Sequence, residues 1–254
     1  MKRFNLFLII VILIVSCSKD HDHEETIKCY SPALHIGYQY QLVSNLDESI
    51  WVICSIVDTV FRTDGQKVFE IKKEYYSGEI NHDYIFHEDS FLVYTELDTI
   101  RNSAGTSDSL PGNPFYEQRV AKSNPENGES WENIKGDDEW GKTYMIAVKK
   151  DMIDTHLGCL HDVFSYELHF YYGNVHLMTV YYANNMGQVG ATLYYNYPEL
   201  DSSVLSLSYL KINGKEYGKK PDNARVRKML LNTEKDKFYV DLLRKASGCI
   251  YPNP

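Results

Sequence analysis

Most of the chain alternates apolar and polar residues, a pattern typical of β-strands that bury one face. The clearest example is residues 163–172. One face of this segment is apolar and aromatic: Phe164, Tyr166, Leu168, Phe170 and Tyr172. The other face is mixed: Val163, Ser165, Glu167, His169 and Tyr171. The alternation predicts a half-buried antiparallel strand.

The same pattern, or a continuous apolar run, predicts further strands along the body of the chain. They lie at 38–42, 49–60, 69–75, 83–87, 90–97, 115–121, 144–148, 175–183, 189–197 and 203–212. Gly173-Asn174 predicts a two-residue hairpin turn between 163–172 and 175–183, because such turns favour these residues. Residues 102–113 and 122–141 are predicted to be loops.

The pattern becomes helical after Pro221. A short helix is expected at 224–231, and a second from Thr233 to about Ala246, where Gly248 can end it. The predicted fold class is mainly β: an antiparallel curved sheet or sandwich with one or two short C-terminal helices. One domain is expected over 28–254, with a break near 122–141 that allows two β-halves.

The first residues predict export. Lys2 and Arg3 precede an apolar run from Leu6 to Val15, and polar residues follow Cys17. A basic start followed by a short apolar core indicates a signal peptide. The run is shorter than the roughly 20 residues that a membrane-spanning helix needs.

Ile14-Val15-Ser16-Cys17 resembles the lipobox of bacterial lipoproteins, although that family more often has leucine where Ile14 stands. The resemblance implies cleavage of residues 1–16 and attachment of fatty acyl chains, such as palmitate, to Cys17. Several buried chains hold a protein on a membrane stably. The predicted partner of Cys17 is therefore the membrane itself.

Residues 17–27 are predicted to be an acidic, flexible tether. They resemble the charged stretch of surface lipoproteins from Bacteroidota-type cells, which implies an outer-membrane lipoprotein facing either the cell surface or the periplasm. His21 and His23 depart from a purely acidic run. A metal site there is disfavoured, because a flexible tail loses entropy when it coordinates an ion.

The net charge and the cysteines of the chain exclude some partners and some kinds of site. The chain has 35 acidic and 26 basic residues, so nucleic acid is not an expected partner. No cysteine lies in a CxxC pair, and no zinc or redox motif is predicted. In an oxidising envelope we predict a Cys29–Cys249 disulfide, with Cys54 and Cys159 as buried thiols in the alternative interpretation.

Three glycine-aromatic segments repeat weakly. Gly37 precedes Tyr38 and Tyr40, Gly128 precedes Trp131, and 181–183 leads into 187–190. Over 30–213 they resemble envelope β-proteins of undetermined function that carry a "VGxxW" opening, a second copy midway and a late "YYAxGVGxV" hairpin. The first copy here lacks the tryptophan. The resemblance implies a fold and no chemistry.

No motif of catalysis, phosphate binding or metal binding is present, and the sequence predicts no catalytic residue, cofactor or metal. Glu167 and His169 lie two apart on one strand face, near enough to share a ligand. His161 lies about 26 Å from His169 in an extended strand, so one site cannot use both histidines. Solvated residues of one strand face are the preferred interpretation.

Aromatic residues give the remaining candidates. Trp131 and Trp140 lie in predicted loops, and Tyr171 and Tyr182 belong to a set of 21 tyrosines suited to a sheet with one wet face. We predict a non-catalytic binding or accessory module for a glycan, lipid or protein. The alternative is a glycosidase-like hydrolase of extracellular polymers that uses the acids of 137–139. The oligomeric state is not indicated.

Overall fold

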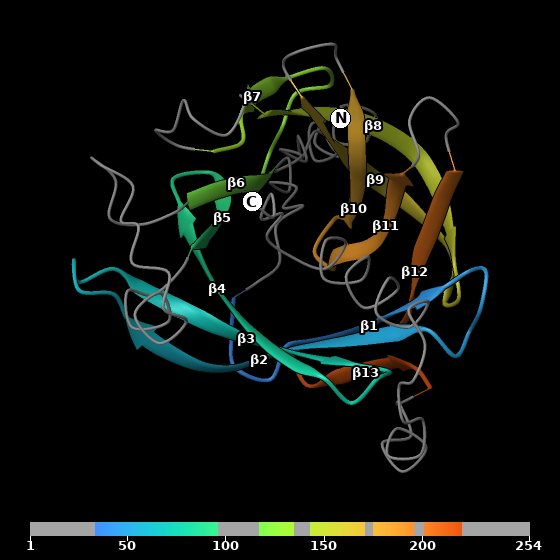
Figure 1. The fold of residues 1–254 in the computed structure, drawn as a ribbon, viewed down its shortest axis with the longest axis horizontal. Helices are drawn as coiled ribbons and strands as arrows, with labels where there is room; N and C mark the ends of the chain where they lie inside the picture. Colours follow the sequence, from blue (N-terminus) through green and yellow to red (C-terminus); the bar gives the residue numbers. More distant parts are fainter. Residues whose placement is uncertain (1–33, 96–116, 135–142, 171–174, 196–200, 220–254) are drawn as a thin grey trace, which may run out of the picture.

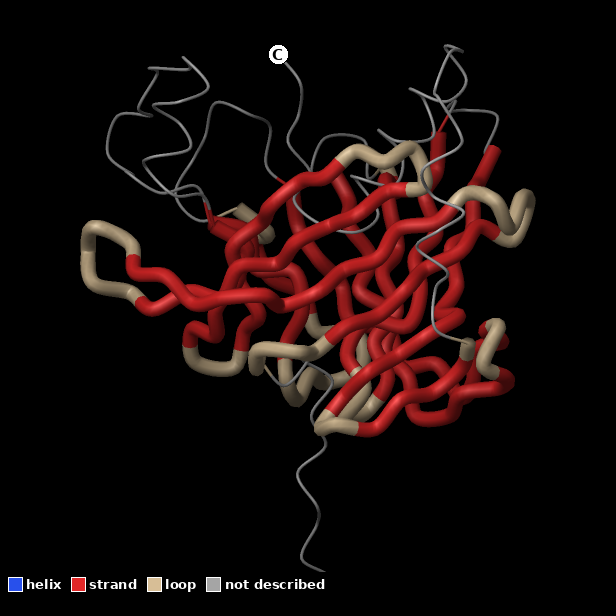
Figure 2. The backbone as a smooth tube through the Cα atoms, turned by 90° about the horizontal axis from the view of Figure 1, so that it is seen from below, coloured by secondary structure: helices blue, strands red, loops and turns tan. Residues whose placement is uncertain are grey.

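The computed structural model describes residues 34–95, 117–134, 143–170, 175–195 and 201–219. All of its regular elements within these ranges are strands (Figure 2). They are β1 (Gln39–Ser44), β2 (Trp51–Phe61), β3 (Lys67–Tyr75), β4 (Ile80–Glu88), β5 (Phe91–Thr95), β6 (Glu117–Lys122), β7 (Ser130–Glu132), β8 (Thr143–Thr155), β9 (Gly158–Phe170), β10 (His176–Ala183), β11 (Gly187–Tyr195), β12 (Asp201–Ile212) and β13 (Lys215–Gly218).

The strands form one antiparallel sheet in the order β6-β5-β4-β3-β2-β1-β12-β11-β10-β9-β8-β7, with β13 added beside β12. Two meanders, β1 to β6 and β7 to β12, therefore join through the β1–β12 pair. The sheet curls until its two ends meet: Gln118 of β6 bridges Ile134, just after β7. The amide of Arg119 also donates to the carbonyl of Asn133 at 2.8 Å. The result is a nearly closed barrel (Figure 1).

The prediction of a mainly β, antiparallel, curved sheet is confirmed. A single sheet that curls on itself replaces the sandwich alternative. The helices predicted at 224–231 and 233–246 lie outside the described residues, and so does the predicted loop at 102–113. Within the described ranges, no helix is long and apolar enough to cross a membrane.

Strands β8 and β9 are longer than predicted, and β9 pairs with β10 in a register other than the predicted one. β8 and β9 each have 13 residues and extend to Thr155 and Gly158, beyond the predicted strands 144–148 and 163–172. His169 pairs with His176, and the amide of Phe170 donates to the carbonyl of Val175 at 2.9 Å. A two-residue turn at 173–174 would instead pair Tyr171 with His176. The predicted turn type is therefore wrong, although the turn residues themselves lie outside the described ranges.

The interior of the barrel is the main core. Strand alternation directs one residue in two inward, and the inward set includes Leu42, Val52, Tyr166, Leu168 and Leu207, all buried. The outward face of β9 is less exposed to solvent than predicted, because Ser165 and His169 are buried on it. A smaller cluster of Val68, Tyr84, Phe86 and Val93 packs separately.

Candidate functional site

The barrel interior, the first candidate site, is crossed by buried tyrosines that bind opposite parts of the sheet. The Tyr38 hydroxyl donates to the Met186 carbonyl at 2.8 Å, and the Tyr40 hydroxyl donates to Gln188 Oε1 at 3.0 Å. The Tyr166 hydroxyl donates to the Lys122 carbonyl at 2.6 Å. Because buried hydroxyls need partners, these bonds fix the tyrosines as structural links between the two meanders.

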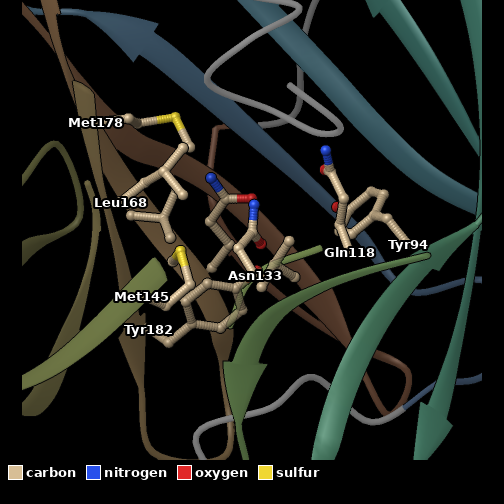
Figure 3. Close-up of a pocket in the computed structure, with 10 residues that line it drawn as sticks. Tyr94, Gln118, Asn133, Met145, Leu168, Met178 and Tyr182 are labelled. Carbon is tan, nitrogen blue, oxygen red and sulfur yellow. The ribbon is translucent and has the colours of Figure 1, made fainter. Parts of the chain in front are cut away.

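One cavity lies between these meanders, near the closure of β6 and β7 (Figure 3). Its volume is about 20 Å³. Its lining comprises Tyr94, Gln118, Val120, Asn133, Met145, Leu168, Met178, Val180, Tyr182 and Gln188. A water needs roughly 10–15 Å³ measured in this way, so the space suits a water molecule and is far too small for a sugar or lipid. Among the described residues, this part of the interior is filled by side chains and has no room for such a ligand.

Two ion pairs are buried in the barrel wall. Lys73 and Asp83 pair on the inward face of β3 and β4, and Lys73 Nζ lies 5.6 Å from the centre of the Tyr94 ring. Arg62 Nη1 lies 2.6 Å from Glu117 Oε1. Burial alone would lower the pKa of Lys73, but the Asp83 carboxylate beside it raises the pKa above its ordinary value. Both pairs are therefore charged and structural.

A second candidate site lies on the outer face of β8 to β11. We call Tyr144, Glu167, His169, His176 and Tyr194 the histidine patch. Four of its rings form a row across the strands: the Tyr144, His169, His176 and Tyr194 ring centres are spaced 5.4, 4.5 and 4.4 Å apart. Glu167 lies two residues before His169 on β9, and its Oε2 is 3.5 Å from His169 Nε2.

The electrostatics of the histidine patch favour the neutral form of His176. Burial and the neighbouring His169 lower the pKa of His176, while Glu167 acts in the opposite direction. His169 is only 8% exposed, and neither of its ring nitrogens forms a hydrogen bond with the described residues. Neutral histidines with available lone pairs are the form that binds metal ions.

The structure separates the residues that the sequence singled out. Tyr182 is buried and lines the small cavity. Trp131 is half-buried on β7: it packs against Phe91 and Tyr166, and its Nε1 donates to the Arg119 carbonyl at 2.9 Å. Both residues lie within the core cluster or against it, so the structure gives each a packing role, and their predicted role in ligand binding stays a prediction.

Other predicted residues fall outside the described ranges. These are Cys17, Cys29, Trp140, Tyr171, Cys249 and the acids of 137–139. Of the two remaining cysteines, Cys54 is a buried free thiol, whereas Cys159 is a free thiol that is exposed near the tip of the β8–β9 hairpin. The interpretation of Cys159 as a buried thiol is therefore wrong. Cys159 and its partner Asp154 lie on the exposed face of the hairpin, whereas Ile153 and Leu160, on the other face, pack against the core.

Sequence reasoning paired Glu167 with His169 and separated them from His161, and the histidine patch agrees with both steps. It missed His176, which comes from the next strand. The predicted hairpin of 163–172 and 175–183 already made the two strands neighbours, but its two-residue turn places His176 opposite Tyr171. The longer connection shifts His176 by two residues and sets it opposite His169.

Comparisons with known proteins give no family. No protein-family model matches the chain, and no curated protein matches it. One similar solved structure is a Bacteroides fragilis protein described as exported and as having a YmcC-like fold; identity is 12%, coverage is 73% of this chain and 100% of that chain, and the TM-score is 0.38. Another is a Parabacteroides distasonis protein described as a lipoprotein, with 13% identity, coverage of 72% and 99%, and a TM-score of 0.36. At these values neither likeness assigns a function.

Proposed function

We propose that this chain is an outer-membrane lipoprotein whose β-barrel is a non-catalytic binding or accessory module. Its anchor is Cys17, the last residue of the lipobox-like segment 14–17. Acyl chains on Cys17 hold the protein at the membrane, and residues 18–27 separate the barrel from it. The barrel presents its outer surface to a glycan, lipid or protein partner.

The observation that carries the non-catalytic part is the pairing of buried acids. Asp83 and Glu117 are the buried carboxylates among the described residues, and each is neutralised by a buried cation, Lys73 or Arg62. A glycosidase needs two carboxyl groups about 5–10 Å apart that face the substrate. Carboxylates held by cations inside a packed wall support a structural role.

The filled interior also directs binding to the outside. A cavity of about 20 Å³ accommodates no organic ligand, whereas small-molecule pockets usually enclose about 300–1,000 Å³. Ligands therefore meet the outer face or the rims of the barrel. An accessory role within a larger envelope assembly uses the same surfaces.

The anchor is tested by Cys17→Ser, with Cys159→Ser as the matched control because Cys159 is an exposed thiol in the barrel. In the native host, wild-type protein and Cys159→Ser should partition with the outer membrane, and mass spectrometry should find acylated Cys17. Cys17→Ser should leave the membrane fraction. An unmodified Cys17 on a freely soluble wild-type product contradicts the proposal.

The binding role is tested by a panel of host and bacterial polysaccharides, envelope lipids and outer-membrane proteins. Saturable binding without new reducing ends is the expected result for a glycan partner. Release of reducing ends by purified protein would overturn the non-catalytic assignment and favour the hydrolase. Absence of saturable binding to every member of the panel would contradict a binding module.

A further inference from the structure

We propose that Glu167, His169 and His176 bind a divalent transition-metal ion, with Zn²⁺ as the best match, on the outer face of β9 and β10. The three residues can each offer one ligand atom, and these atoms lie within 4.8 Å of one another. The proposal is independent of the membrane anchor and of any glycan partner, so it stands or fails separately from the proposed function.

The donor set selects the class of metal. Two imidazoles and one carboxylate suit Zn²⁺, Cu²⁺ or Ni²⁺, whereas Ca²⁺ and Mg²⁺ prefer oxygen ligands. Three protein ligands on zinc leave a fourth position for water or for a group of a partner. The site is thus open rather than closed, which fits its place on a surface that the partner can reach.

The separations are close to those of a metal centre. Zinc–nitrogen and zinc–oxygen bonds of about 2.0–2.1 Å place tetrahedral donors about 3.3 Å apart. Glu167 Oε2 and His169 Nε2 lie 3.5 Å apart. The rings of His169 and His176 are stacked, with centres 4.5 Å apart and planes at 10°. The donor atoms of all three residues lie within 4.8 Å of one another, so metal binding requires them to approach by no more than about 1.5 Å.

The state of His169 points to a ligand. Its side chain is nine-tenths buried, and both ring nitrogens lie in the protein without a hydrogen bond to the described residues. A buried polar group without such a bond destabilises the fold. A metal ion coordinated by one of these nitrogens removes that cost, whereas a purely packed histidine retains it.

His176 is oriented by contacts of the kind found around metal ligands. Its Nε2 lies 3.2 Å from the Met178 carbonyl and 2.9 Å from Thr179 Oγ1. In the tautomer with its hydrogen on Nε2, the ring donates to the Met178 carbonyl, and the lone pair of the neutral ring lies on Nδ1. Ligating histidines commonly donate their other N–H to a carbonyl in this way.

A register shift places His176 in the site. The β9–β10 pairing is irregular between His176 and Met178. Such bulges redirect side chains and often occur beside functional sites. Here the bulge keeps His176 on the outer face next to His169, while Met178 turns into the core.

One neighbouring charge opposes metal binding and provides a sharp test. Lys150 Nζ of β8 lies 4.0 Å from Glu167 Oε1. A cation at this position competes with a metal ion for the same carboxylate. Removal of the Lys150 charge should therefore tighten metal binding, an effect that a merely structural cluster would not produce.

The experiment titrates full-length protein in detergent with Zn²⁺ against a chromophoric chelator at pH 7.5. His21→Ala and His23→Ala are present in every sample, because the predicted tether holds histidines of its own. One Zn²⁺ per chain is expected. Ca²⁺ and Mg²⁺ should fail to displace it.

Three variants and a matched control locate the ion. His176→Gln, Glu167→Gln and His169→Ala should each weaken zinc binding by about 10- to 100-fold, or abolish it. His161→Ala removes an exposed histidine from the same strand and should bind as before. Circular dichroism identifies any variant that is unfolded, and the half-buried Glu167 and His176 allow the test even if His169→Ala does not fold.

Lys150→Gln should tighten zinc binding about 3- to 10-fold, whereas Lys149→Gln, an exposed neighbour, should leave it unchanged. The proposal is overturned if the parent protein binds no zinc. It is also overturned if folded Glu167→Gln and His176→Gln bind as the parent does, or if His161→Ala removes the zinc, which would place the ion beside Cys159 and His161.

Discussion

The barrel wall and its outer face both bury titratable side chains, but the two regions differ in the partners that these side chains find. Inside, Lys73 pairs with Asp83, so each charge has a partner of opposite sign. Outside, His169 is buried between two rings, and its nitrogens form no hydrogen bond with the described residues. His169 is as buried as Asp83, and the presence of a charged partner distinguishes the two residues.

This difference separates a structural role from a binding role. A buried ion pair whose partners are complementary needs nothing further, and removal of one member leaves an uncompensated charge. A buried imidazole without a hydrogen bond is stabilised by a metal ion that coordinates it. The interior pair should therefore dominate stability, whereas the histidine patch should dominate responses to metal ions and protons.

The largest expected effect comes from breaking the interior pair. Asp83→Asn leaves Lys73 buried without a counter-charge and should lower the free energy of unfolding by about 3–5 kcal/mol. Chemical denaturation monitored by tyrosine and tryptophan fluorescence measures the change. A loss below about 1 kcal/mol would show that Lys73 reaches water, and the comparison of the two regions would fail.

A matched control lies on the same strand. Lys72 Nζ and Glu74 Oε1 form a half-exposed pair at 2.8 Å on the opposite face of β3. Glu74→Gln should cost no more than about 1 kcal/mol, because solvent screens such a pair. The double variant Lys73→Met, Asp83→Leu should be more stable than Asp83→Asn, since it removes both charges together.

The sequence predicted the sheet because alternation sets the inward face locally. Phe164, Tyr166 and Leu168 were expected on one face of a strand, and all three are buried in the core. Alternation also places Lys73 on the inward face of its strand, because it lies two residues from Ile71 and two from Tyr75. A lysine among apolar positions is ordinarily an edge or surface residue, and its burial depends on Asp83 from the next strand.

Contacts between strands could not be predicted in the same way. His169 and His176 meet because the β9–β10 connection is longer than a two-residue turn and a bulge follows. Each of these features shifts the pairing without altering the alternation of either strand. The closure of the barrel also depends on such pairing: Gln118 lies in a predicted strand, but β7 and Ile134 lie in the segment 122–141, which was wrongly predicted to be a loop throughout.

The labelling rates of the two free thiols are a smaller effect, and they test whether reagents can reach the barrel interior. Burial raises the pKa of the Cys54 thiol to about 11, although Lys73 acts in the opposite direction. At pH 8 about one such thiol in a thousand is ionised, and it is also covered. Cys159 is exposed. Iodoacetamide should therefore label Cys159 at least about 100-fold faster than Cys54 in the folded protein.

Peptide mass spectrometry after timed labelling measures both rates in one sample and separates them from those of Cys29 and Cys249. Labelling of Cys54 should accelerate in denaturant, in parallel with loss of the fold, because access to it requires opening of the barrel. Asp83→Asn should speed it as well, as the variant unfolds more often. Equal rates for Cys54 and Cys159 in native buffer would contradict a packed interior.

The smallest expected effect is the pH response of the histidine patch. Burial and His169 lower the pKa of His176 in the folded protein, Lys150 acts in the same direction, and Glu167 opposes them. Below the ordinary histidine pKa of about 6.5, the unfolded chain therefore binds a proton more readily than the folded chain. The contribution of neutral His176 to stability is complete above that pH and declines as the pH falls toward the lowered pKa.

His176→Gln removes this contribution, so its free energy of unfolding should fall less steeply than that of the wild type as the pH drops from 7 to 5. A chelator in all buffers keeps metal ions from adding a second dependence on pH, since metal binding competes with protons. His161→Gln removes an exposed histidine from the same strand and should retain the wild-type slope. Because burial also lowers the pKa of His87, some slope should remain in every variant. If His176→Gln follows the wild type throughout, His176 is as solvated in the folded chain as in the unfolded one, and the outer face does not bury titratable groups in the way the barrel wall does.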